Sequence, residues 1–115
     1  MRSFIQDGHS LVLRVIRKLV ADPAVVLVVE EVHSRDWASA TFVGQLHRMD
    51  CKLKGSFEAV QAAAQRLRDE LPESDADGSE RLFLADASVT ALRMTGRRDG
   101  RATASLSIEA LTLLA

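Results

Sequence analysis

The apolar residues of this chain change their spacing from a helical period to a strand period, and the change occurs twice in the same order. Between residues 10 and 21 they recur at i, i+4 and i+8 in two adjacent columns, which is the apolar stripe of an amphipathic helix. Between residues 48 and 54 apolar and charged side chains alternate strictly, as they do in a strand with one buried face. The two patterns predict different structures, so they constrain the order of elements.

The first half of the chain predicts one helix followed by two strands. Ser10 is expected to cap the helix, and Asp22-Pro23 to end it, because a residue before proline is pushed out of the α region. The run 24–33 is dense in β-branched residues and predicts a strand, and the run 41–55 predicts a second strand.

The turn between these two strands is placed at residues 35–39. In that register His33 pairs near Ala40, and His47 lies about 20 Å from His33 at roughly 3.3 Å per residue. The alternating pattern also puts His47 on the face of Met49, which is the buried face.

The second half of the chain repeats the plan. Ser56 is expected to cap a helix that runs to about Leu71, before Pro72. Residues 81–94 predict a third strand and residues 101–115 a fourth. Between them lies a turn at 96–100, in which Asp99-Gly100 is the typical pair for positive φ.

These elements predict one α+β domain over residues 1–115, with the order α-β-β-α-β-β. It consists of two helix-hairpin units, about 10–55 and 56–115, joined edge to edge. We expect a four-stranded antiparallel sheet with both helices on one face, a two-layer sandwich whose order is a circular permutation of the ferredoxin-like order. Residues 1–9 are expected to form an arm before the first helix.

Composition excludes several classes of function. Sixteen acidic residues balance fifteen basic ones, which argues against nucleic-acid binding. There is one cysteine, Cys51, so an intrachain disulfide is excluded and a reducing compartment fits. No apolar run has the roughly 18 residues of a membrane-spanning helix, and the start of the chain lacks a signal peptide's apolar region. We therefore expect a cytoplasmic protein without a membrane partner.

No pattern in the sequence predicts catalysis or a cofactor. Ser34, Ser39 and Asp36 lie near His33 and His47, but the expected register separates the two histidines. The acidic run 73–78 has the spacing of a calcium loop, yet its twelfth position is Leu84 where a bidentate Glu is needed. We expect no metal site, and we expect the arginines of the 96–100 turn and Arg101 to be solvated.

One feature favours an interaction surface. Part of the sheet is apolar on the face that the helices should leave open, and contiguous exposed apolar area marks an interface. The residues concerned are Phe42, Leu46, Leu111 and Leu113. The leading hypothesis is a non-catalytic module that binds copies of itself, or a protein partner, through this face. In the competing interpretation Phe4 and Ile5 fold back and cover it.

A second hypothesis is a small-molecule-binding protein or enzyme with a site at a subunit interface. The residues that would form this site, near the 33–40 turn, are His33, Arg35, Asp36 and Trp37. Trp37 has a simpler role as well, since an aromatic residue at a hairpin tip commonly packs against the end of a core.

Overall fold

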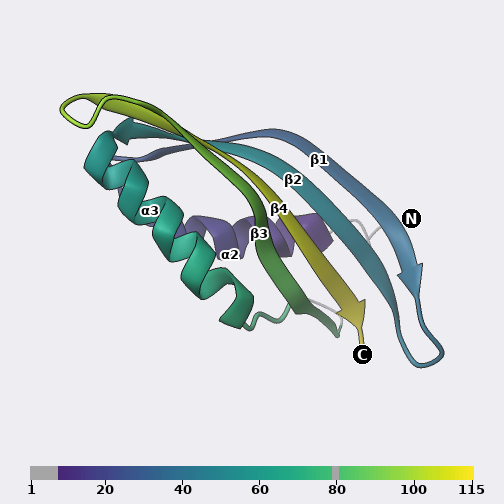
Figure 1. Ribbon diagram of the computed structural model, residues 1–115. Helices are drawn as coiled ribbons and strands as arrows, with labels where there is room; N and C mark the ends of the chain where they lie inside the picture. The colour runs from purple at the N-terminus through teal and green to yellow at the C-terminus, as the bar shows by residue number, and fades with distance from the viewer. Residues whose placement is uncertain (1–7, 79–80) are drawn as a thin grey trace.

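The structure, a computed structural model, describes residues 8–78 and 81–115. It contains the helices α2 (Gly8–Val20) and α3 (Phe57–Glu70), the short 3₁₀ helix η1 (Leu71–Glu73), and the strands β1 (Val26–Ala38), β2 (Val43–Ser56), β3 (Leu82–Gly96) and β4 (Arg101–Leu114). The predicted order α-β-β-α-β-β is confirmed (Figure 1).

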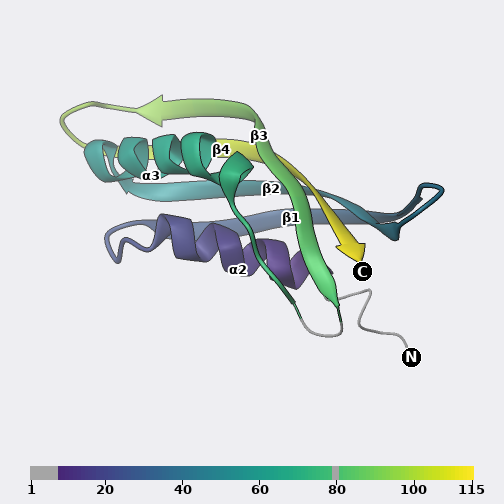
Figure 2. The same ribbon diagram turned by 90° about the horizontal axis from the view of Figure 1, so that it is seen from below.

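The four strands form one antiparallel sheet in the order β1-β2-β4-β3. Each helix-hairpin unit contributes two adjacent strands, and the units meet where β2 pairs with β4. Both helices lie against the same face of the sheet (Figures 1 and 2). This is the predicted two-layer α+β arrangement. We call the helix side of the sheet the inner face and the opposite side the outer face.

The core lies between the inner face and the apolar stripes of the helices. On β2, Met49, Cys51 and Leu53 are buried as the alternation predicts, and on β4 the same holds for Leu106 and Ile108. The helices contribute most of the remaining buried side chains, among them Val12, Ile16, Val60 and Leu67. The core is therefore aliphatic, as the scarcity of aromatic residues requires.

Polar contacts fix the helix ends. The Ser56 hydroxyl accepts a hydrogen bond from the Ala59 N–H and caps α3, as predicted. The Arg66 guanidinium donates to the carbonyls of Leu19 (2.9 Å) and Val20 (3.0 Å) at the end of α2, so it satisfies two terminal carbonyls and links the helices. The prediction for Ser10 was wrong, because Gly8 and His9 before it are already helical.

The first hairpin extends further than predicted. β1 continues to Ala38, and the turn is at residues 39–42 rather than 35–39. The Ser39 hydroxyl accepts from the N–H groups of Thr41 (3.3 Å) and Phe42 (3.1 Å), which stabilises the turn. The polar run that looked like a turn remains extended because this part of the hairpin projects beyond the helices (Figure 2). A strand that is largely exposed on both faces does not need an apolar side chain at every second position.

The turn of the second hairpin was placed correctly, but its glycine was not. Gly96 has a φ of 123°, whereas neither Asp99 nor Gly100 has a positive φ. The N–H of Gly100 bonds to the Arg97 carbonyl (3.0 Å), and that of Arg97 bonds to the Arg101 carbonyl (3.3 Å). The left-handed conformation is needed where β3 ends, not at the tip.

The expectation of an arm over residues 1–9 was wrong for Gly8 and His9, which belong to α2. The other residues of this range, Phe4 and Ile5 among them, lie outside the described residues.

The coverage of the sheet predicts unequal effects of core truncations. Leu53 is fully buried under the helices, whereas Val32 on the same side of the neighbouring strand is 37% exposed. We expect Leu53→Ala to lower the free energy of unfolding by about 2–5 kcal/mol, because it leaves a cavity. Val32→Ala should cost less than about 1 kcal/mol. Urea denaturation followed by circular dichroism measures both, and equal losses would contradict the unequal coverage.

Candidate interaction surface

The outer face of the sheet is apolar at the end formed by the first hairpin. Trp37, Gly44, Leu113 and Phe83 lie in one row across the four strands. The next row places Leu46 beside Leu111. We call the apolar side chains of this region the distal cluster: Trp37, Phe42, Leu46, Phe83, Leu111 and Leu113.

The rings of Phe42 and Phe83 hold this cluster together across the sheet. Their centroids are 6.4 Å apart and their planes meet at 79°, an edge-to-face arrangement. Phe42 remains 39% exposed although it packs on another aromatic ring, whereas Leu113, the cross-strand partner of Phe83, is only 7% exposed. The cluster is therefore well packed within the sheet and open toward solvent.

All four residues that the sequence put forward as an interface lie in the distal cluster. Sequence reasoning placed Trp37 in a turn and did not include Phe83. The face of Phe83 could not be read from the sequence, because β3 has irregular pairing between Leu84 and Asp86 and between Val89 and Ala91. Odd-numbered and even-numbered residues therefore do not keep to the same face along the whole of β3.

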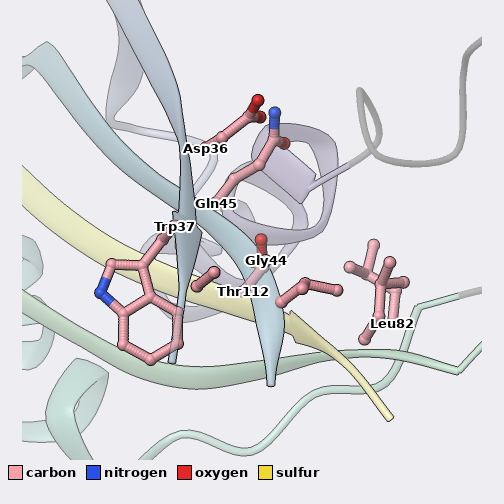
Figure 3. Close-up of a pocket in the computed structure, with 9 residues that line it drawn as sticks. Asp36, Trp37, Gly44, Gln45, Leu82 and Thr112 are labelled. Atoms are coloured by element: carbon pink, nitrogen blue, oxygen red, sulfur yellow. The ribbon is translucent and has the colours of Figure 1, made fainter. Parts of the chain in front are cut away.

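The four residues suggested as a ligand site do not converge on one point. His33, Arg35 and Trp37 alternate along β1 on the outer face, while Asp36 is on the inner face. In Figure 3, Trp37 points away from the Asp36 and Gln45 side chains. His33 instead contacts Glu31, with 2.7 Å between Nε2 and Oε2.

A groove of about 360 Å³ lies at the same end of the sheet. Its apolar lining includes Val43, Leu82 and Leu114, and its polar lining includes Asp36 and Gln45 (Figure 3). Within the described part of the chain, the Gln45 Oε1 atom is buried without a hydrogen-bond partner. This acceptor would suit a donor group on an otherwise apolar molecule.

His47 occupies the inner face where the helix layer begins. Its Nδ1 lies 2.7 Å from the Ser34 hydroxyl and its Nε2 lies 2.8 Å from the Thr112 hydroxyl, so one imidazole joins β1, β2 and β4. The first residue of α2 packs directly on it: a Cβ added to Gly8 would lie 2.8 Å from His47 Nε2. The predicted parity of His47 is confirmed, but its strand is central rather than at an edge.

The register correction brings His33 and His47 to neighbouring rungs, because His33 pairs with Arg48 and Ser34 with His47. The expected separation of about 20 Å was therefore wrong. The two histidines nevertheless point to opposite faces. A hydrolytic triad needs a third group that orients the base, usually a carboxylate, and here both imidazole nitrogens meet hydroxyl groups instead. We interpret the Ser34–His47–Thr112 contact as structural.

Burial shifts the titration of two inner-face groups. Desolvation, and to a smaller degree the nearby His9, lowers the pKa of His47 to about 4. Desolvation, followed by the charges of Asp50 and Glu30, raises the pKa of the Cys51 thiol to about 11. His47 is thus neutral and Cys51 is an unreactive thiol at neutral pH.

The other candidate features occupy separate places. The Arg98 guanidinium lies 5.7 Å from the Phe57 ring centroid, and Arg97 lies 3.7 Å from the Asp99 carboxylate. Among the described residues, no group of three or more His, Cys, Asp or Glu side chains could hold a metal ion. In the same part of the chain, neither helix combines the length and apolarity needed to cross a membrane.

Comparison with known proteins gives one similarity of fold. No family model matches the chain, and no curated protein matches it. Among solved structures, the chain is similar to a chain of a structure described as the virion of a native gene transfer agent particle. The TM-score is 0.59, the sequences are 16% identical, and the match covers 96% of this chain and 95% of the other. At this identity the likeness shows a shared fold.

The His47 contact predicts a pH-dependent stability. The folded pKa of about 4 lies below the ordinary value of 6.5, so the unfolded chain binds the proton more readily. The free energy of unfolding should therefore fall as the pH drops from about 6.5 toward 4, by up to about 3 kcal/mol at roughly 1.4 kcal/mol per pKa unit. Urea denaturation at several pH values measures this.

Two variants isolate the contribution of His47. His47→Gln should flatten the dependence in that window, because the amide does not titrate. His33→Gln, which changes an exposed histidine, should retain the wild-type slope. Equal slopes in wild type and His47→Gln would show that another group is responsible.

Proposed function

We propose that this protein is a non-catalytic structural subunit that associates with copies of itself through the distal cluster. The observation that carries the proposal is the packed apolar patch that the helices leave uncovered. Such a patch loses contact with water when a second surface covers it, and aromatic side chains contribute most to interfaces of this kind. Phe42, at 39% exposed, and the half-buried Trp37 are its open aromatic residues.

The fold comparison supports this proposal. The similar chain belongs to a virion particle, which is an assembly of many subunits, and the match spans nearly the whole of both chains. A chain of this size and architecture can therefore serve as part of a larger protein assembly. We also propose the cytoplasm as its location, since its one thiol is buried and fits a reducing compartment.

Substitutions in the distal cluster test the proposal. Phe42→Asp and Leu111→Asp should raise the dissociation constant of self-association at least about tenfold, because each buries a charge in the contact. Phe42 lies at the turn, so its replacement is the milder change for the fold. Light scattering over a hundredfold concentration range gives the mass, and circular dichroism confirms folding.

Val26→Asp is the matched control. Val26 is 55% exposed on the outer face, at the opposite end of the sheet from the cluster. It should leave the association unchanged. A wild-type protein that remains monomeric at the highest concentration, or an oligomer indifferent to both cluster variants, would refute the proposal. In the first case a different protein would be the partner to seek.

A second candidate function is binding of a small molecule in the groove, which is at the same end of the sheet as the cluster but is lined mainly by inner-face residues. The buried, unpartnered Gln45 Oε1 among the described residues favours it, since a ligand with an N–H or O–H donor would satisfy that atom. A ligand that binds only the folded chain stabilises it, so a metabolite that occupies the groove should raise the melting temperature. A metabolite library that leaves the melting temperature unchanged would count against this function.

A further inference from the structure

The two edges of the sheet differ in their protection. On β3 the ladder is broken at two places, and the start of the strand is covered by the Asp77–Phe83 bridge and by the bond from Leu84 N–H to the Ala76 carbonyl (2.9 Å). On β1 the ladder with β2 is regular from Glu31 to Ala38. In the described part of the chain, no backbone hydrogen bond is made to the open edge of this stretch, the edge that faces away from β2.

An edge strand with free N–H and C=O groups pairs readily with another strand, and proteins commonly protect such edges. β1 forms the open border of the sheet in Figure 1. Its charged side chains alone would discourage indiscriminate pairing. Their order along the strand, however, makes the edge complementary to itself.

Two outer-face charges of β1 have no opposite charge directly across on β2, although the Glu31 carboxylate contacts His33 of its own strand. Glu31 is opposite Asp50, a charge of the same sign, and Arg35 is opposite Leu46. Among the described residues, Arg35 forms no salt bridge. The two charges lie four residues apart on one face, with His33 midway between them.

Antiparallel pairing of two such edges brings these charges together. Directly opposed residues must share a face, so a two-fold axis perpendicular to the sheet passes midway between the two copies of a single residue. With the axis at His33, Glu31 is opposite the partner's Arg35, and this pair occurs twice. With the axis at Arg35, the two copies of Arg35 are opposite each other, which places like charges together. With the axis at Ser34, His33 is opposite the partner's Arg35.

We propose that two copies of this chain pair through β1, edge to edge and antiparallel, about a two-fold axis at His33. The pairing extends the sheet from four strands to eight and ends near Glu30, where the register shifts and the side chain already contacts Lys52 at 3.3 Å. This contact goes beyond the proposed function. It uses the edge of the sheet, whereas the distal cluster uses the outer face, so both can be occupied in one assembly.

Cysteine cross-linking tests the axis. In the proposed register the two copies of residue 33 are opposite each other, about 4.5–5.5 Å between Cα atoms, which suits a disulfide. His33→Cys should therefore form a covalent dimer under mild oxidation with oxidised glutathione. Arg35→Cys is the matched control: its two copies would lie about 13 Å apart at roughly 3.3 Å per residue, too far for a disulfide. In wild type the only cysteine, Cys51, is 2% exposed and should not cross-link.

Charge reversal tests the complementarity without relying on a disulfide. Glu31→Arg and Arg35→Glu each oppose two pairs of like charges and should raise the dimer dissociation constant about tenfold. The double variant Glu31→Arg/Arg35→Glu restores both pairs and should return the constant to near the wild-type value. Both positions are exposed, so the fold should tolerate the changes.

The outcomes separate this proposal from the proposed function. Failure of His33→Cys to cross-link, or a double variant as weak as the single ones, would overturn the edge pairing. If Leu111→Asp still dissociated the oligomer in that case, the role of the distal cluster would stand. A covalent His33→Cys dimer with an intact response to charge reversal, in a protein indifferent to Leu111→Asp, would instead support the edge contact and refute the cluster.

Discussion

The helices of this protein are too short to cover its sheet. A helix rises about 1.5 Å per residue and a strand about 3.3 Å, so helices of 13 and 14 residues span about 20 Å while strands of similar length span more than 40 Å. The molecule is accordingly elongated, with extents of 51 × 24 × 20 Å. The half of the sheet that the helices cover contains one aliphatic core. The half that they leave uncovered must be stabilised by other interactions.

The boundary between the two halves is marked by a polar contact. His47 is buried where α2 begins, and its imidazole joins three strands through the hydroxyls of Ser34 and Thr112. A buried imidazole with both nitrogens paired avoids the desolvation cost that an unpaired one would incur. Beyond this boundary the sheet is held by its ladders and by aromatic packing on the outer face. The distal cluster is thus a structural element of the projecting end as well as a surface for contact.

The sequence predicted the parts of the fold that a buried face determines. Met49, Cys51 and Leu53 alternate because one side of β2 meets the helices, and Ser56 is recognisable because a helix start needs an acceptor. The register of the first hairpin was not predictable in this way. Glu31, His33, Arg35 and Asp36 lie where solvent reaches both faces, so their polarity resembles that of a turn. Sequence reasoning identified four outer-face residues because apolar side chains are unusual at positions that otherwise alternate as polar: Phe42, Leu46, Leu111 and Leu113. It missed Phe83 because the irregular pairing of β3 changes which positions face outward.

The two central strands determine how the sheet would resist an applied force. β2 and β4 are paired without interruption from Val43–Leu114 to Ser56–Arg101, so they cross both the covered and the uncovered half. A force along these strands would load their hydrogen bonds together, in shear, whereas a force that peels β1 away would break its bonds one after another. The projecting hairpin is therefore stiff along its axis and compliant at its free edge.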